Sequence, residues 1–192
     1  MLLAYNGATG ESLLERVRME NIDGREAGLG LRAVDYELLT CQIVSLAEAD
    51  SHWLPVLANA SALIYEALDN VNWAGFYLAD AESMRRGAPE LRLGPFQGKS
   101  ACVRIAWGRG VCGTAAVTGE TQLVPDVHAF PGHIACDAAS RSEVVVPMVV
   151  GGEVRGVLDI DSPLPGRFSE ADAHGLERVV GAILSATELP EL

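Results

Sequence analysis

Two aspartates, Asp159 and Asp161, interrupt an otherwise apolar stretch near the end of the chain, Val-Leu-Asp-Ile-Asp. Side chains two positions apart on a β-strand point to the same face, so the pair is predicted to lie side by side. Aspartate is disfavoured in strands, and like charges repel, which raises the pKa of one member. If the two aspartates line a pocket that keeps one carboxyl group protonated, that group can act as an acid. Glu143 is a candidate third carboxyl group of the same pocket. A solvated sheet face explains the same pattern without chemistry.

Three of the four cysteines, Cys102, Cys112 and Cys136, fall in the loop-rich middle of the chain. They are too far apart for local pairing, but a fold could bring them to one pocket. The alternative for each is a small core residue. Cys136 is the strongest candidate because it follows His133 in a loop-like stretch, and a nearby histidine increases the thiolate character that redox chemistry requires. The fourth, Cys41, lies among apolar neighbours on a predicted helix and is expected in the core.

Two other motifs are weaker. The segment Gly108-Arg-Gly-Val-Cys-Gly113 matches the glycine pattern of dinucleotide sites, but the helix after it is too short and no parallel return strand follows. We interpret these glycines as a turn into a short helix. His128, His133 and Cys136 do not have zinc-ligand spacing, and no C-x-x-C pair completes a set of four, so no metal site is predicted.

The elements that must position these residues follow from periodicity. After Val34 the pattern is helical in two segments, the second with Ser51 as its N-cap. Their apolar faces are Leu38, Leu39, Ile43, Leu46 and Ala47 in the first segment, and Leu57, Ala60, Leu63, Ile64 and Leu68 in the second. A closing helix begins at Ser169, where Ser169 and Asp172 resemble a capping box.

Between the helices the pattern changes to that of strands. The predicted strands are 73–78, 91–96, 101–106, 144–150 and 154–161, with a polar loop after the first, a short helix 110–117 after the third, and a two-glycine turn between the last two. Trp73 and Tyr77 share a face of the first strand, where they line a pocket or simply pack in the core. This order of elements predicts an α+β domain with an antiparallel sheet.

Composition excludes several classes of partner. The 192 residues include 26 acidic and 14 basic side chains, a net charge of −12, so neither nucleic acid nor a membrane surface is an expected partner. The first residues have no pattern typical of a signal peptide, and no apolar run approaches the ~20 residues of a membrane span. We expect a cytoplasmic protein. Residues 1–33 lack a clear period and are interpreted as an N-terminal extension that is partly disordered.

From Val34 to Leu184 the chain resembles the free methionine-(R)-sulfoxide reductases, a family of single GAF domains. The matching stretches are Asn72-Trp-Ala-Gly-Phe-Tyr-Leu78, Leu93-Gly-Pro-Phe-Gln-Gly-Lys99, Ala101-Cys-Val-Arg-Ile105, Gly108-Arg-Gly-Val-Cys-Gly-Thr-Ala115, Asp126-Val-His-Ala-Phe-Pro-Gly-His-Ile-Ala-Cys-Asp-Ala-Ala-Ser140 and Gly156-Val-Leu-Asp-Ile-Asp-Ser162. The resemblance implies a GAF-like α+β fold, with a six-stranded antiparallel sheet flanked by N-terminal and C-terminal helices. The catalytic domain would span 34–187, followed by a short tail, 188–192. A loop over 77–91 is longer than the family pattern and touches no motif.

The resemblance also implies roles for the cysteines. Cys136 corresponds to the attacking cysteine, Cys102 to the cysteine that resolves the intermediate, and Cys112 to a third thiol that assists or substitutes. The acidic residues that hold the substrate ammonium and the sulfoxide oxygen correspond to Glu143, Asp159 and Asp161, with Glu143 and Asp161 counted as catalytic. Trp73 and Tyr77 correspond to the aromatic wall around the S-methyl group.

The implied activity is thiol-dependent reduction of free L-methionine (R)-S-oxide to L-methionine. The implied route is a cysteine sulfenic acid followed by an intramolecular disulfide that thioredoxin recycles. A thiolate attacks a sulfoxide only if the oxygen gains a proton, so this chemistry needs a low-pKa thiol and a high-pKa acid. The expected partners are the free sulfoxide, thioredoxin and a second copy in a homodimer, with no bound cofactor. The alternative is a non-catalytic GAF module that binds a small ligand or senses redox state, and such a module would tolerate Cys136→Ser.

Overall fold

The structure is a computed structural model and describes residues 32–132 and 138–191. The chain divides into Met1–Val34 and Asp35–Leu192, and the described helices and strands belong to the second unit. They are α2 (Tyr36–Ala49), α3 (Trp53–Ala67), β1 (Trp73–Ala79), α4 (Ala81–Arg85), β2 (Glu90–Gly98), β3 (Arg104–Ala106), α5 (Gly110–Thr118), β4 (Gln122–Val124), a 3-10 turn (Val127–Ala129), β5 (Ser142–Val150), β6 (Glu153–Ser162) and α6 (Glu170–Ala186).

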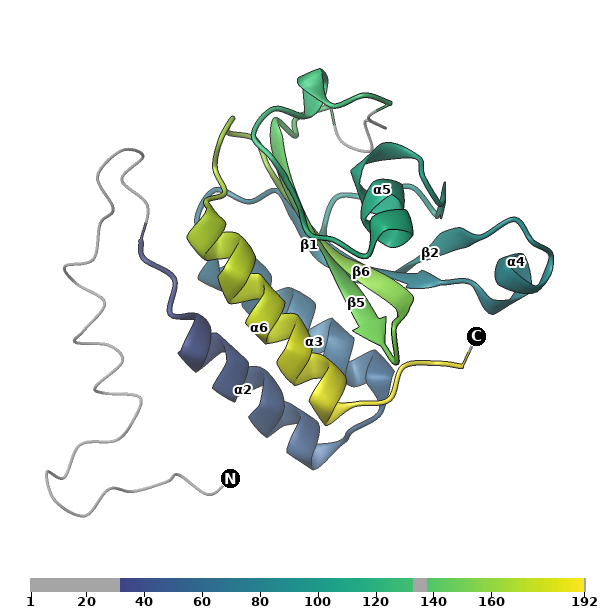
Figure 1. Cartoon of the computed structure of the whole chain (residues 1–192). Helices are drawn as coiled ribbons and strands as arrows, with labels where there is room; N and C mark the ends of the chain where they lie inside the picture. The colour runs from purple at the N-terminus through teal and green to yellow at the C-terminus, as the bar shows by residue number, and fades with distance from the viewer. Residues whose placement is uncertain (1–31, 133–137, 192) are drawn as a thin grey trace, which may run out of the picture. The chain divides into compact units, whose positions relative to one another are not determined.

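Six strands of the described residues form one antiparallel sheet in the order β3-β2-β1-β6-β5-β4, which confirms the predicted fold class. Helices cover both sides of it (Figure 1). α3 packs on β1 and β2, α6 packs on β5, and α2 lies against α3 and α6. α5 lies on the opposite face, over β5 and β6.

The two faces of the sheet differ in chemistry. Alternate residues of β1, β5 and β6 that are buried and apolar form the face under α3 and α6, and they include Phe76, Val146 and Leu158. The residues between them face α5 and include Trp73, Glu143 and Asp159. The polar residues of the central strands therefore gather on the face that α5 covers.

The first helix is found where periodicity predicts it, but its buried stripe is narrower. Its core residues are Tyr36, Leu39, Ile43 and Ala47. Cys41 is exposed, so its predicted core position is wrong. Residues two apart on a helix point in nearly opposite directions, and Cys41 follows the buried Leu39 by two positions. Leu46 is 44% exposed because it lies at the edge of the stripe.

The cap of the second helix also differs from the prediction. α3 begins at Trp53, and its N-cap is His52, whose Nδ1 accepts a hydrogen bond from the Leu54 N–H at 3.2 Å. Ser51, the predicted cap, lies one residue earlier, and its carbonyl accepts a hydrogen bond from the Thr187 hydroxyl. None of the helices in the described ranges is long and apolar enough to cross a membrane.

The other predicted helices and strands agree with the structure apart from the strand ends, whereas the predicted N-terminal extension lies outside the described residues up to residue 31. β5 and β6 form the hairpin with its Gly151-Gly152 turn, and α6 has the capping box, in which the Ser169 and Asp172 side chains each bond the other's backbone N–H. β3 is shorter than predicted and begins only at Arg104. Sequence periodicity did not reveal the short strand β4, and the polar loop after β1 contains the one-turn helix α4.

Candidate active site

The register of three adjacent strands brings the predicted pocket residues into rows. Asp161 on β6 pairs with Trp73 on β1 and with Glu143 on β5. One row further along, Asp159 pairs with Gly75 and Val145. Directly paired residues in an antiparallel sheet project on the same face. Trp73, Glu143, Asp159 and Asp161 therefore share the face that α5 covers.

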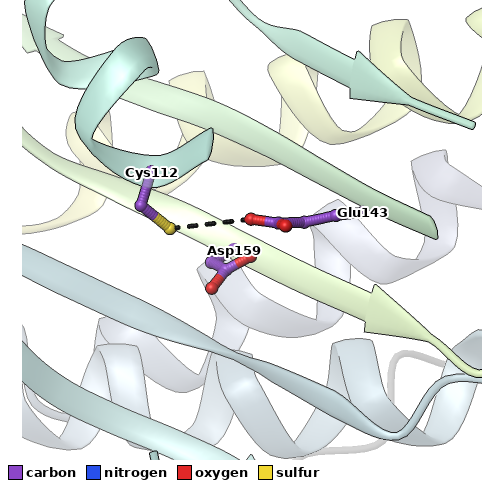
Figure 2. Close-up of side chains that lie close together, drawn as sticks. All are labelled: Cys112, Glu143 and Asp159. Carbon is purple, nitrogen blue, oxygen red and sulfur yellow. Dashed lines mark hydrogen bonds between the residues drawn. The ribbon is translucent and has the colours of Figure 1, made fainter. Parts of the chain in front are cut away.

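Helix α5 places a thiol over these carboxylates. Cys112 lies in the first turn of α5, and its Sγ is 3.9 Å from Glu143 Oε1 (Figure 2). The Cys112 sulfur, one Glu143 oxygen and one Asp159 oxygen all lie within 4.8 Å of one another. All three residues are buried, and Glu143 and Asp159 are only 5% and 6% exposed. The structure thus assembles a compact cluster of one thiol and two carboxyl groups from two strands and a helix.

The glycine motif at the start of α5 allows the helix to pack closely against the strand before it. A Cβ atom on Gly113 would lie 2.5 Å from the carbonyl oxygen of Ala106, so only glycine fits at that backbone approach. The Gly108 N–H donates to the Gly113 carbonyl at 2.8 Å and closes the turn into the helix. This agrees with the interpretation of the segment as a glycine-rich turn into a short helix.

Burial dominates the electrostatics of the cluster. It raises the pKa of Glu143 well above the usual range, and the charges of Asp159 and Asp161 raise it further. It also raises the pKa of Asp159, to about 6, although hydrogen bonds with Cys112 and Glu143 oppose the shift. Burial also raises the pKa of the Cys112 thiol, and the charges of Asp159, Glu143 and Asp161 raise it further. Burial and the neighbouring negative charges therefore favour the protonated form of Glu143 and the neutral form of the Cys112 thiol.

An aromatic stack borders the carboxylates. The Trp73 ring lies 5.7 Å from the Tyr77 ring and 5.3 Å from the Phe96 ring, both in stacked geometry, and its Nε1–H donates to the Lys99 carbonyl at 3.1 Å. Gly75 makes this possible, since a Cβ there would meet the Phe96 Cβ at 2.3 Å. Phe96 was not among the predicted site residues, although it belongs to the same matching stretch as Lys99.

Asp161 is only partly buried. Its carbonyl accepts a hydrogen bond from the Asn72 N–H at 3.0 Å. The Asn72 side chain in turn donates from Nδ2 to Ser140 Oγ at 3.1 Å. Asn72 thus ties the start of β1 to the end of β6 and to the segment before β5, a role that no sequence pattern indicates.

The cysteines differ in state. Cys102 is disulfide-bonded and packs against the core cluster that contains Trp73 and Cys112, whereas Cys41 and Cys112 are free thiols. Cys136 and His133 lie outside the described residues. The other histidines lie on other elements: His128 is exposed in the 3-10 turn, His52 caps α3, and His174 on α6 lies 3.2 Å from Glu177.

Comparisons with known proteins agree with this picture. A family model described as the GAF domain matches residues 57–188. The free methionine-R-sulfoxide reductase of Escherichia coli is 52% identical over 139 residues, 72% of this chain and 80% of the relative. The protein of the same name from Saccharomyces cerevisiae is 45% identical over 152 residues, 77% and 82% of the two chains. The solved free methionine-R-sulfoxide reductase of Neisseria meningitidis, in complex with its substrate, is 42% identical, with a TM-score of 0.74 over 84% of this chain and 95% of that one.

Proposed function

This chain belongs to the GAF domain family and, within it, to the free methionine-R-sulfoxide reductases, and we propose that it reduces free L-methionine (R)-S-oxide to L-methionine. The observation that carries the proposal is the buried pair of Glu143 and Asp159 beside an aromatic stack. The substrate has one cationic ammonium, one sulfoxide oxygen that must be protonated, and one S-methyl group. The carboxyl groups and the aromatic stack together offer a matching group for each of these three parts of the substrate.

The two kinds of carboxyl group take different parts of the substrate. Asp159 and Asp161, as carboxylates, hold the ammonium, because a buried negative charge is stabilised by a cation within hydrogen-bond distance. Glu143, whose pKa is raised by burial so that its protonated form is favoured, donates its proton to the sulfoxide oxygen. Trp73 and Tyr77 form the apolar wall for the S-methyl group, where sulfur and methyl contacts with aromatic rings are favourable.

Two cysteines carry the redox steps of the proposed reaction. The Cys136 thiolate attacks the sulfoxide sulfur while the oxygen takes a proton, and collapse transfers hydroxyl to Cys136, releasing methionine and leaving a sulfenic acid. The Cys102 thiol then attacks the sulfenic sulfur, forming a Cys102–Cys136 disulfide and water. The disulfide-bonded state of Cys102 supports its part in this step. Cys112, a buried neutral thiol hydrogen-bonded to Glu143, is better suited to holding the acid in place than to attack.

Thioredoxin is the proposed external dithiol, which returns the disulfide to two thiols in a compartment that keeps cysteines reduced, the cytoplasm. A homodimer stays a prediction.

The direct test is thioredoxin-coupled oxidation of NADPH with each diastereomer of free methionine sulfoxide. We expect turnover with the (R) form only, no turnover by Cys136→Ser, and unchanged turnover by Cys41→Ser, which removes an exposed thiol. Absence of turnover with both diastereomers, while methionine also fails to form with dithiothreitol as reductant, would contradict the proposal.

A further inference from the structure

The cluster of Cys112, Glu143 and Asp159 also has the composition of a metal-binding site. A thiolate sulfur and two carboxylate oxygens are donors that Zn²⁺ accepts, and three protein ligands with one position left for water is a frequent arrangement around zinc. The three donor atoms lie within 4.8 Å of one another (Figure 2). They come from α5, β5 and β6, so no spacing of residues along the sequence could have indicated them.

The distance between the Cys112 sulfur and the Glu143 oxygen fits a tetrahedral ion after a small contraction. With Zn–S of about 2.3 Å and Zn–O of about 2.0–2.2 Å, tetrahedral geometry places the sulfur about 3.5–3.7 Å from each oxygen. The Cys112 sulfur and Glu143 Oε1 are 3.9 Å apart in the structure. A shift of a few tenths of an ångström in either side chain therefore brings both atoms to ligand distance.

A second observation points to a cationic ligand. Asp159 is 6% exposed, and its Oδ1 atom is buried with no hydrogen-bond partner. A buried carboxylate oxygen without a partner is costly, and a bound cation satisfies it. We propose that Cys112, Glu143 and Asp159 bind a Zn²⁺ ion directly, and that this ion excludes the substrate.

Competition follows from shared ligands and rests on the proposed function. The carboxylate that would hold the substrate ammonium, Asp159, and the acid that would protonate the sulfoxide, Glu143, are both occupied when the metal is bound. Metal binding also requires loss of the Cys112 proton and the Glu143 proton. The metal-bound protein therefore lacks both the cation site and the proton donor, and reduction stops until the ion leaves.

The test isolates Cys112 as the remaining thiol. In a chain carrying Cys41→Ser, Cys102→Ser and Cys136→Ser, Co²⁺ is titrated while the thiolate-to-cobalt charge-transfer absorption is followed. We expect saturable absorption with one equivalent of Co²⁺, bleached by Zn²⁺. Adding Cys112→Ser should abolish the absorption. Adding Asp159→Asn or Glu143→Gln should weaken cobalt binding by at least about tenfold, because loss of even an outer-shell partner costs ~10–100-fold in metal affinity. Glu120→Gln, on an exposed residue, is the matched control and should change nothing.

Two outcomes overturn the metal site: no charge-transfer band in the chain with Cys112 alone, or a band that survives both carboxylate substitutions unchanged. The same chain has no attacking thiol but keeps the substrate ligands, so free methionine (R)-sulfoxide should raise the apparent Kd for Co²⁺ in proportion to its concentration. An apparent Kd for Co²⁺ that does not change with sulfoxide concentration would contradict the competition and the assigned substrate ligands. It would leave the proposed metal site intact. A result that overturns only the metal site has no bearing on the coupled reductase assay, which tests the proposed function separately.

Discussion

Cys112 Sγ lies 3.9 Å from Glu143 Oε1, although the two residues are 31 positions apart and lie on different kinds of element. Because α5 packs on β5 and β6, this contact covers the two carboxyl groups on the α5 side of the sheet. It places the thiol where it stabilises a carboxyl group by hydrogen bonding.

Replacement of Asp159 by asparagine is expected to stabilise the protein at neutral pH. The pKa of Asp159 is raised to about 6 in the folded chain, whereas an aspartate in the unfolded chain titrates near about 3.9. The folded state binds the extra proton between these values, so this group lowers the free energy of unfolding as pH rises from about 4 to about 6. The penalty is absent below that window and complete above it.

Thermal unfolding at pH 4 and pH 7 checks this. The difference in Tm between Asp159→Asn and the wild type should be larger at pH 7, with the variant the more stable there. Glu120→Gln removes an exposed carboxylate and should give the same small difference at both pH values. An Asp159→Asn difference that does not change with pH would show that the carboxylate is solvated.

A single-turnover experiment distinguishes the attacking thiol from the resolving thiol. Cys136→Ser should form no methionine, while Cys102→Ser should form about one equivalent per chain and then stop, because attack precedes resolution. Quenched samples analysed for methionine give both numbers. Full turnover by Cys136→Ser would contradict the assignment of the nucleophile, and full turnover by Cys102→Ser would transfer resolution to Cys112.

The oxidised protein is expected to contain a Cys102–Cys136 disulfide, with Cys41 and Cys112 as free thiols, as both are in the structure. Cys112 stays reduced because it is buried and its pKa is raised. Digestion without reductant, followed by peptide mapping after one equivalent of sulfoxide, identifies the bridge. A bridge containing Cys112 as the main product would be incompatible with its role beside Glu143.

Gly75→Ala should disrupt the aromatic stack. The added Cβ would lie 2.3 Å from the Phe96 Cβ and 2.8 Å from the Trp73 ring, and overpacking of this kind costs about 1–3 kcal/mol. We expect a lower Tm and a higher KM for the free sulfoxide. Gly181→Ala, on α6 with open space around it, is the matched control and should raise stability by about 0.5–1 kcal/mol. Equal effects of the two substitutions would mean that Trp73 and Phe96 can move apart freely.

The elements of this fold were predictable where local patterns decide them. The capping box at Ser169 and the Gly151-Gly152 turn are local signals, and both elements are found as predicted. Period-two alternation likewise places Asp159 and Asp161 on one face. Alternation does not reveal which of them is buried, since that depends on where α5 packs: Asp159 lies beneath it and Asp161 is partly exposed.

Features set by distant contacts were not predictable. Cys41 looked like a core residue because its neighbours are apolar, but only the narrow seam of α2 against α3 and α6 is covered. Cys112 contacts Glu143, 31 positions away, and Asn72 donates a hydrogen bond to Ser140, 68 positions away. Nothing in the residue types encodes these distances.

The carboxylates of the site are expected to select the free amino acid. A peptide-bound methionine sulfoxide offers a neutral amide in place of the ammonium, which would leave a buried carboxylate unpaired at a cost of at least ~1–3 kcal/mol. A site built around a polar partner rejects an analogue without it by as much as ~10⁴-fold. The measurement is kcat/KM for free methionine (R)-sulfoxide and for its N-acetyl derivative, with wild type, Asp159→Asn and Asp161→Asn. We expect a very low value for the N-acetyl compound. In the variants the difference between the two compounds should narrow, mainly because kcat/KM for the free substrate falls. Comparable kcat/KM for the two compounds in the wild type would show that the carboxylates do not select the free amino acid.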